Sequence, residues 1–335
     1  MPVELDSPVV VTGASGFIGR HLLESLAAKG VKARAVTRGE TTFPAGVETV
    51  LASDILDAQA IRRAMQGATA VVHLAARVHS KPEGKGDPAS ECRRVNVEGT
   101  SLVLEEAAVA GVRTVVFVSS VKAVASESDT ALRPDTPPQP ADVYGESKLE
   151  AERLVKVAAV REGLRAPILR LPVVYGPGMK ANMAALFRAV DRGFPLPLAS
   201  VKNRRSFAYV GNVVGAVEAL LSDGVEDSEV FYVSDGEDLS TPGLVRHVAH
   251  ALNRPVRLIA VPPRLLRATG KTGGLLSRIA GLHFSTESVT AVLGSLFVDT
   301  SSLREMTGYT PPFTVEKGMS LTAAWFRAKS TGARR

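Results

Sequence analysis

Cysteine is nearly absent from this chain: among its 335 residues, only Cys92 carries a thiol. A single cysteine excludes an intramolecular disulfide framework, and the sequence therefore indicates a reducing compartment. Cys92 lies in the stretch ECRRVN, which is typical of a helix, and we interpret it as a small packed residue rather than a nucleophile. Spacings of His, Cys and Asp that are typical of a metal site are also missing, so we expect no bound metal.

Long apolar runs are missing as well, since none approaches the roughly 18 residues that a membrane helix needs. The first residues, MPVELD, carry acids in place of the basic patch of a targeting signal. From these absences we expect a cytoplasmic protein with no membrane partner. The net charge of +6 is modest, and the lysines and arginines are scattered, which argues against a nucleic-acid partner.

Short apolar strands and amphipathic helices alternate over roughly the first half of the chain. The expected strands are Val9–Thr12, Lys32–Val36, Val47–Leu51, Ala70–Leu74, Thr114–Val118 and Ala166–Leu171, and the expected helices are Ile18–Lys29, Ala58–Met65, Glu91–Ala110 and Tyr144–Glu162. This alternation predicts an α/β fold, with a doubly wound parallel sheet of Rossmann type that is covered by helices on both faces.

The pattern changes after Gly176-Pro177-Gly178, where the regular alternation ends. We predict a dinucleotide-binding domain over residues 1–175, a segment 207–235 that returns to it, and a smaller substrate-binding lobe over most of 176–335. Residues 262–296 are apolar and punctuated by glycine, and we assign them to a mainly helical part of that lobe. The proline-rich segment Ser126–Asp142 is either a cover for a cleft or a plain surface connection.

Three glycines mark the most informative stretch, which reads VVVTGASGFIG over residues 9–19. Gly13, Gly16 and Gly19 follow a Val-rich strand and lead into an apolar helical run. Backbone at glycine can pass close to a pyrophosphate, and the N-terminus of a helix presents N–H groups to its charge. The first gap is one residue longer than in G-x-G-x-x-G, so the stretch is a variant of that fingerprint. A plain tight turn is the alternative, but the flanking strand and helix favour dinucleotide binding.

Tyr144 and Lys148 are four residues apart near the start of an expected helix, so their side chains share one face. An ammonium beside a phenol favours the phenolate, and we expect it to lower the tyrosine pKa from about 10. Upstream, an expected strand ends in FVSS, which places Ser119 and Ser120 at the carboxyl edge of the sheet, where open α/β sheets bind ligands. Either hydroxyl can hold a substrate oxygen while Tyr144 moves a proton. The alternative for both serines is a cap or turn role, and for Ser119 it is the better one.

Further motifs follow one another along almost the whole chain. They are TGASGFIG, Asp54 in SDILD, VVHLAA at 71–76, Asn96 in NVEGT, VSS at 118–120, YGESK at 144–148, LPVVYGPG at 171–178, RRSFAYV at 204–210, VSDGE at 233–237 and VDTSSLREMTGYTPP at 298–312. In this order they resemble the extended short-chain dehydrogenases/reductases, and in particular the NAD-dependent epimerase/dehydratase family. The resemblance implies an enzyme that acts on a nucleotide-sugar, with a UDP-sugar as substrate.

The resemblance also implies a role for individual residues. It places Gly13, Gly16, Phe17, Ile18 and Gly19 at the cofactor pyrophosphate, Asp54 and Ile55 at the adenine, Pro172 and Val174 near the nicotinamide, and Leu74, Ala75, Ala76, Asn96, Val118, Tyr144 and Lys148 along the rest of the cofactor. It implies a catalytic set of Ser120, Tyr144 and Lys148. The substrate candidates are Ser119, Ser120, Lys122, Tyr144, Asn182 and Arg205. Arg205 can hold a pyrophosphate bidentately, and its alternative is a surface salt bridge.

Three departures from the family pattern narrow the function. Family dehydratases place Asp-Glu after the catalytic hydroxyl residue, whereas this chain has Val121-Lys122, which argues against a 4,6-dehydratase. The second strand lacks the acid that binds a ribose 2′-hydroxyl and ends in Thr37-Arg38, so the cofactor is NAD or NADP(H), with Arg38 as a contact. The R-x-x-D clamp of some UDP-sugar epimerases has no clear match around residues 293–298, which leaves the nucleotide base open.

The stretches GPGMKANM, GFPLPL and NRRSFAYVGN are similar to those of reductases that act on UDP-4-keto-6-deoxy-N-acetylhexosamines. We therefore expect a 4-ketoreductase that gives a UDP-N-acetylquinovosamine-type product, with Tyr144 as proton donor. The close alternative is a UDP-glucose or UDP-N-acetylglucosamine 4-epimerase that holds NAD tightly. A non-catalytic dinucleotide-binding regulator is a remote third, because such relatives commonly lose the tyrosine or the lysine. Family members pair through helices that resemble those expected at 91–110 and 144–162, so we expect a homodimer.

Overall fold

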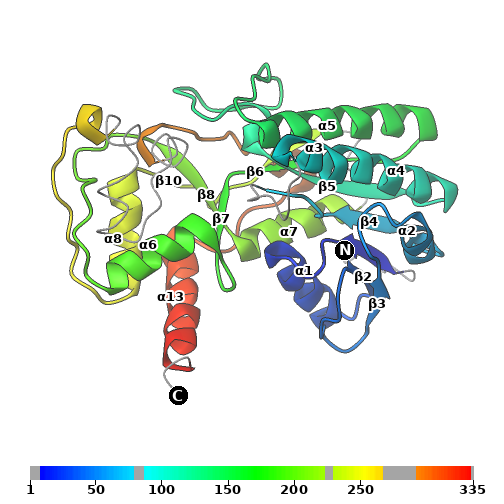
Figure 1. Cartoon of the computed structure of the whole chain (residues 1–335), viewed down its shortest axis with the longest axis horizontal. Coiled ribbons are helices and arrows are strands. Elements are labelled where there is room, and N and C mark those ends of the chain that lie inside the picture. The colour runs from blue at the N-terminus through cyan, green and yellow to red at the C-terminus, as the bar shows by residue number, and fades with distance from the viewer. Residues whose placement is uncertain (1–7, 79–86, 223–228, 267–291, 333–335) are drawn as a thin grey trace.

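A seven-stranded parallel sheet forms the centre of the larger part of the molecule (Figure 1). The computed structural model describes residues 8–78, 87–222, 229–266 and 292–332. The sheet has the order β3-β2-β1-β4-β5-β6-β9. Its strands are β1 (Val9–Thr12), β2 (Ala33–Thr37), β3 (Val47–Leu51), β4 (Ala70–His73), β5 (Thr114–Ser120), β6 (Ile168–Leu171) and β9 (Val230–Tyr232). The doubly wound Rossmann-type fold expected from the alternation of strands and helices is thereby confirmed.

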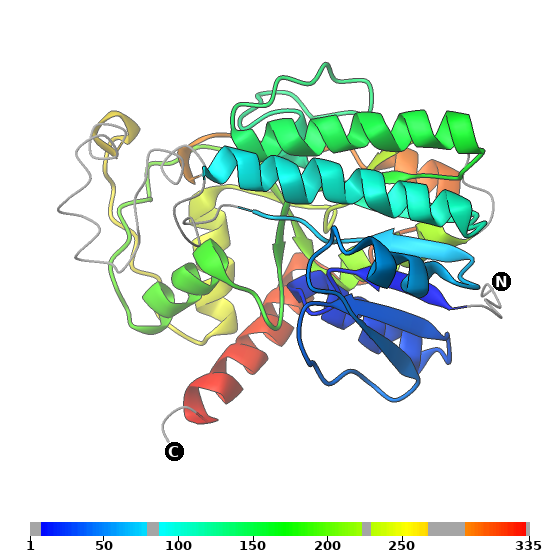
Figure 2. The ribbon, with the colours of Figure 1, turned by 45° about the vertical axis from the view of Figure 1, so that its right-hand side comes forward.

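Helices cover both faces of this sheet, because most side chains of the strands other than the edge strand β3 are apolar and buried on both faces. One face packs against α1 (Phe17–Ala28), α7 (Val210–Leu221) and α12 (Ser301–Thr307). The other packs against α2 (Ala58–Met65), α4 (Gly99–Val109) and α5 (Val143–Glu162), and Figure 2 shows α4 and α5 side by side above the sheet. Two apolar cores thus sandwich the strands.

The order of the strands reverses next to β1, since β2 lies on one side of it and β4 on the other. The connections that leave the carboxyl ends of β1 and β4 therefore diverge onto opposite faces of the sheet. Such a switch point opens a crevice at the carboxyl edge, where ligands bind in open α/β sheets. The glycine turn of residues 13–19 lies at this point.

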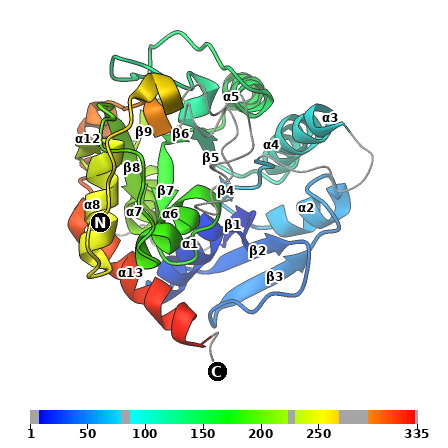
Figure 3. The same cartoon turned by 60° about the vertical axis from the view of Figure 1, so that its left-hand side comes forward.

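A smaller lobe is built around a second sheet with the order β10-β8-β7 (Figure 1), and Figure 3 shows β7 and β8 beside α6. Its strands are β7 (Val173–Tyr175), β8 (Arg205–Tyr209) and β10 (Asp238–Leu239), and its helices are α6 (Ala181–Asp191), α8 (Thr241–Ala251) and α13 (Val315–Gly332). Apolar residues of these elements form a third core, in which the Phe187 and Phe326 rings lie 5.7 Å apart.

The boundaries differ from the prediction in three places. Residues 207–209 belong to β8 in the second sheet, so only α7 and β9 of the segment 207–235 lie with the large sheet. Helix α12 packs back onto that sheet through Leu303, although the sequence assigned its region to the lobe. The expected helix 91–110 begins earlier, with α3 (Pro88–Arg93), and continues through a π-helical turn, η1 (Arg94–Glu98), into α4. Of the stretch 262–296, residues 267–291 lie outside the described residues.

The proline-rich segment 126–142 is fastened to a distant part of the chain. The backbone N–H groups of Ser128 and Leu132 donate to the carbonyls of Ser295 and Phe297, at 2.7 and 2.8 Å, and Asp299 donates back to Leu132 at 2.9 Å. The first half of the segment is thus bonded to the stretch that precedes α12.

Candidate active site

The backbone of the glycine turn packs so tightly that a side chain could not be accommodated at any of its three glycines. At Gly13, which has a φ of +66°, a Cβ atom would lie 2.7 Å from the backbone nitrogen of Ala75, at the end of β4. At Gly16 and Gly19 it would lie 2.9 and 2.6 Å from the carbonyl oxygen of Gly13. Gly16 is also the N-cap residue of α1 and has no side chain to occupy the helix N–H groups. These groups remain available to an anion.

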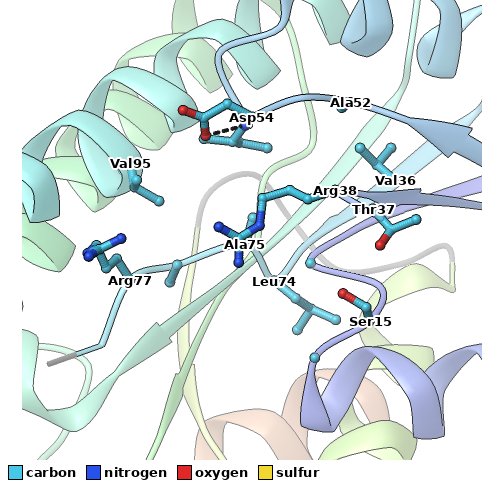
Figure 4. Close-up of a pocket in the computed structure, with 14 residues that line it drawn as sticks. Ser15, Val36, Thr37, Arg38, Ala52, Asp54, Leu74, Ala75, Arg77 and Val95 are labelled. Carbon is cyan, nitrogen blue, oxygen red and sulfur yellow. Dashed lines mark hydrogen bonds between the residues drawn. The ribbon is translucent and has the colours of Figure 1, made fainter. Parts of the chain in front are cut away.

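A cavity of about 260 Å³ opens beside this turn at the carboxyl ends of β1, β2 and β4 (Figure 4). Its lining residues are Gly13, Ser15, Gly16, Val36, Thr37, Arg38, Ala52, Asp54, Ile55, Leu74, Ala75, Ala76, Arg77 and Val95. Figure 4 shows the Arg38 side chain projecting among them. Most of these were expected at a cofactor; the sequence analysis missed Ser15, Val36, Thr37, Ala52, Arg77 and Val95. Ser15 lies inside the glycine motif and Arg77 directly follows Ala76, so proximity to the motifs was the available signal.

The carboxylate of Asp54 is fixed at the edge of the cavity. One oxygen accepts from the backbone N–H of Ile55 at 2.6 Å, and the other accepts from Arg94 at 2.5 Å. Around it, Val36, Ala52 and Ile55 provide an apolar wall. A flat aromatic base with polar edges fits this environment, in which the Asp54 carboxylate is a hydrogen-bond acceptor beside an apolar wall.

Asn96 holds the cavity wall rather than facing the cavity. Its amide oxygen accepts from the Arg77 N–H at 2.7 Å, and its nitrogen donates to the Arg77 carbonyl at 3.1 Å and to the Ser147 hydroxyl at 2.9 Å. The side chain is buried, with both ends of its amide occupied. The expected direct cofactor contact is therefore corrected to support of the Arg77 backbone.

Ser120, Tyr144 and Lys148 come together between β5 and α5. A side-chain hydrogen bond joins Ser120 to Tyr144. The Lys148 ammonium donates to the carbonyl oxygen of Val118 at 2.8 Å and lies 4.0 Å from the centre of the Phe117 ring. The helix places these groups because Asp142 caps its first turn, accepting from the Gly145 N–H at 2.7 Å.

The protonation states differ from the expected ones. Burial raises the pKa of Tyr144 to about 12, against the hydrogen bond from Ser120, while the nearby Cys92 and Asp142 raise it further. Burial lowers the pKa of Lys148 to about 7, against the attraction of Glu152. The expectation that the ammonium depresses the tyrosine pKa is thus wrong: burial is the largest cause of the shift, and Lys148 is not among the groups that move the pKa of Tyr144. At neutral pH the phenol is protonated.

Ser119 belongs to a buried ion-pair network and does not face the site. Its hydroxyl donates to Glu152 at 2.5 Å, and Glu152 also accepts from the Arg170 guanidinium at 3.0 and 2.7 Å. Successive residues of a strand point to opposite faces, so Ser119 and Ser120 separate. The assignment of Ser119 to substrate binding is corrected to a structural role.

Neither the catalytic set of Ser120, Tyr144 and Lys148 nor the remaining substrate candidates are among the residues that line the cavity. Lys122 donates to Asp142 at 2.6 Å. Asn182 is exposed in the first turn of α6. Arg205 is buried on β8 and donates to the Gly294 carbonyl at 3.0 Å, so it is not the surface salt bridge of the alternative interpretation. Burial lowers its pKa to about 10, and the nearby Glu127 opposes this.

Phe17 and Ile18, which were expected at the pyrophosphate, open α1. Of the residues expected near the nicotinamide, Pro172 is buried and Val174 is half-buried on β7. His73 behaves as the hydrogen-bonded structural histidine that the sequence suggested. Its ring nitrogens contact the hydroxyls of Thr12 and Thr100 at 2.6 and 3.0 Å, and burial lowers its pKa to about 3.

Cys92 is packed against Asn96 and Ser147, as expected of a small buried residue. Over the described ranges, three or more His, Cys, Asp or Glu side chains do not gather in a way that could hold a metal ion. Likewise, none of the helices described is both long enough and apolar enough to span a bilayer.

Comparison with known proteins agrees with this geometry. Residues 9–233 match the model of the NAD dependent epimerase/dehydratase family. The chain is 32% identical over 330 residues to a UDP-glucose 4-epimerase of Vibrio cholerae, with 96% of each chain covered. It is 28% identical over 328 residues to the N-acetyl-alpha-D-glucosaminyl-diphospho-ditrans,octacis-undecaprenol 4-epimerase of Escherichia coli O157:H7, with 95% of each covered.

Among solved structures, the chain is similar to a UDP-glucose 4-epimerase of Thermus thermophilus in complex with NAD. The two superpose with a TM-score of 0.73 at 26% identity, and the match covers 96% of this chain and 99% of the other. The similarity extends over both sheets, so it includes the smaller lobe as well as the nucleotide-binding part.

Proposed function

Because the chain belongs to the NAD-dependent epimerase/dehydratase family, we propose that it inverts the configuration at C4 of a UDP-hexose or UDP-N-acetylhexosamine. The observation that carries the proposal is the grouping of Ser120, Tyr144 and Lys148 where β5 ends, at the carboxyl edge of the sheet that also carries the glycine turn two strands away. The relatives named above are 4-epimerases, which supports this reaction over the 4-ketoreductase that the sequence favoured.

The residues present fit an NAD cofactor. The glycine turn would be filled by any Cβ and leaves the N–H groups of α1 open, which suits a pyrophosphate. Asp54 and its apolar neighbours would hold the adenine, and Lys148 would contact the nicotinamide ribose. When bound, NAD supplies the acceptor and donor of a hydride.

The chain's own groups manage the proton at the C4 oxygen. Ser120 holds that oxygen by a hydrogen bond, and Tyr144 exchanges a proton with it. In the resting site the phenol is protonated, because burial raises its pKa to about 12. Taking a proton from a C4 hydroxyl requires the phenolate, and a protonated Lys148, four residues along the same helix, is the positive charge that would stabilise it. Asn182 and Arg205 would contact the sugar-nucleotide diphosphate.

A 4-ketoreductase remains a second candidate, because the protonated phenol is ready to donate to a developing C4 oxyanion. The two reactions differ in cofactor turnover. An epimerase returns its hydride and keeps NAD, whereas a reductase consumes NAD(P)H and exchanges it. A 4,6-dehydratase is disfavoured, because Val121 and Lys122 stand where the elimination needs two acids.

The proposal is tested by incubating the purified protein with UDP-glucose, UDP-N-acetylglucosamine and their C4 epimers, and resolving the products by ¹H NMR. We expect interconversion of one epimer pair without added cofactor, and NAD released on denaturation. Tyr144→Phe should lower kcat about 10²- to 10⁴-fold. Failure to convert any of the four sugars, or unchanged turnover in Tyr144→Phe, would contradict the proposal. Oxidation of NAD(P)H only with a 4-keto sugar would favour the reductase.

We also propose that the chain forms a homodimer through α4 and α5. Apolar side chains on these helices are exposed, with Val109 at 79%, Val157 at 58% and Val160 at 85%. Pairing of the two helices with a second copy would bury them. Light scattering after gel filtration should give twice the 35.3 kDa of the chain, and Val160→Asp should shift the mass towards one chain. A monomeric wild-type protein would contradict this proposal.

A further inference from the structure

At the start of α5, the carboxylate of Asp142 both caps the helix and pairs with Lys122. One of its carboxylate oxygens accepts from the Gly145 N–H at 2.7 Å and caps the helix. The other accepts from the Lys122 ammonium at 2.6 Å. Asp142 is two residues before Tyr144, and Lys122 is two residues after Ser120. The ion pair therefore joins the segment that carries Ser120 to the helix that carries Tyr144.

The backbone around this pair is equally close. Lys122 lies in the 3-10 turn η2 (Val121–Ala123), and its backbone N–H donates to the Ser120 hydroxyl oxygen at 3.2 Å. The carbonyl of Lys122 lies against Gly145, where a Cβ would collide with it. The pair also closes the two ends of the proline-rich segment, where the Gln139 N–H donates to the Val124 carbonyl at 2.7 Å.

We propose that Lys122 and Asp142 form a positioning clasp, which fixes the Ser120 hydroxyl relative to the Tyr144 phenol. This inference rests on the proposed function, because it assigns these residues to the alignment of the proton-transfer pair. Lys122 thereby changes from a substrate candidate to a residue that acts through Ser120 and Tyr144. It occupies a position where dehydratases of the family carry an acid, and here it serves alignment.

The ion pair between Lys122 and Asp142 is expected to contribute little to the free energy of folding. Both side chains are partly exposed, 29% for Lys122 and 16% for Asp142, and partly exposed pairs contribute little to folding. Helix capping does not need the charge either, since Asn caps as well as Asp. Proton transfer, in contrast, depends on small displacements of the reacting groups.

The charge of Lys122 also opposes that of Asp142 near the phenol. The groups that shift the pKa of Tyr144 include Ser120 from β5, Cys92 from α3 and Asp142 at the cap of α5, while Lys148 lies one turn further along the helix. Asp142 raises the pKa of Tyr144, so an uncompensated carboxylate makes the phenolate harder to form. Lys122 reduces that effect by pairing with it.

The test compares Lys122→Met, Lys122→Arg, Asp142→Asn and the double variant Lys122→Met/Asp142→Asn. We expect Lys122→Met to lower kcat about tenfold to a hundredfold, while NADH binding, followed by fluorescence, stays unchanged. Lys122→Arg should restore most of the rate. The limb of the pH profile that reports Tyr144 should move to higher pH in Lys122→Met and to lower pH in Asp142→Asn, with the double variant between them.

Lys29→Met is the matched control. It removes a lysine–carboxylate pair of the same 2.6 Å length, to Glu218, at the end of α1 away from the site. It should leave kcat and the pH profile unchanged. An unchanged kcat in Lys122→Met, or an equal loss of kcat in Lys29→Met, would overturn the clasp and leave the ion pair only a structural role.

Crystal structures of the wild type and Lys122→Met separate this inference from the proposed function. A longer distance between the Ser120 and Tyr144 hydroxyls in the variant is the expected result. An unchanged distance overturns the clasp, whether or not the protein turns over a nucleotide-sugar. Absence of turnover in the wild type overturns the proposed function instead.

Discussion

Lys148 should make the cofactor-free protein less stable than it would be with an uncharged residue in its place. Its side chain is buried, and burial lowers its pKa from 10.5 to about 7. One pKa unit corresponds to about 1.4 kcal/mol, so a shift of this size corresponds to about 5 kcal/mol of unfavourable burial below pH 7. Lys148→Met removes the charge but leaves the Val118 carbonyl without its donor, which costs about 1–3 kcal/mol. The net expectation is a stabilisation of at least about 2 kcal/mol at pH 7.

The sign of the pH dependence follows from the same shift. Between about pH 7 and 10.5 the unfolded chain binds a proton at Lys148 that the folded chain does not, so wild-type stability rises with pH across this window. The advantage of Lys148→Met should therefore shrink as pH rises, and vanish near the upper end.

Urea unfolding at several pH values between about 6.5 and 9.5 measures the difference, on protein freed of nucleotide because a bound ligand would stabilise the fold. Lys148→Arg is the control, since it keeps a charge that does not titrate in this range. A Lys148→Met variant that is less stable than the wild type at pH 7, with the same pH dependence, would refute the reasoning. If Lys148→Met is more stable than the wild type at pH 7, the buried lysine of the site lowers the free energy of unfolding of the cofactor-free protein.

Two other variants test separate parts of the structure. Glu152→Gln should lower the free energy of unfolding by about 3 kcal/mol or more, because the buried Arg170 loses its counter-charge; a loss below about 1 kcal/mol, by urea unfolding, would argue against the network. Arg38→Ala should weaken NADP binding about tenfold or more and NAD binding little, because a guanidinium at the end of β2 can pair with a 2′-phosphate; equal effects on both, by isothermal titration, would place Arg38 on the adenine instead.

Much of the fold could be predicted from local patterns. The strand Val9–Thr12 and the helix 58–65 have the predicted bounds, because short Val-rich runs and clear apolar periodicity are local signals. The π-helical turn at Arg94–Glu98 was not predicted, because the sequence pattern there is that of an uninterrupted helix; within the turn, Asn96 accepts from the backbone N–H of the distant Arg77. The placement of β8 in the second sheet depends on its pairing with β7 and β10, which the chain alone does not reveal.

The site shows the same division. The glycine turn and the Tyr144–Lys148 pair follow from sequence spacing. The pKa values do not, because hydration is lost only when β5 and α5 enclose these groups. Because successive side chains of a strand point to opposite faces, the sequence could predict that Ser119 and Ser120 lie on different faces of the sheet. It could not predict which serine faces the site, since that depends on where Glu152 and Arg170 lie. The ion pair between Lys122 and Asp142 could not be predicted, because no local sequence pattern indicates that the two ends of the loop between them meet.

The central claim is that Tyr144 and Ser120 act on the C4 oxygen while hydrogen moves at C4 itself. Conversion of a UDP-hexose carrying deuterium at C4, followed by ¹H NMR and mass spectrometry in ordinary water, tests it most directly. We predict the inverted C4 epimer with its deuterium retained, and no such product from Tyr144→Phe. Washout of the label into solvent, or equal conversion by Tyr144→Phe, would contradict the account.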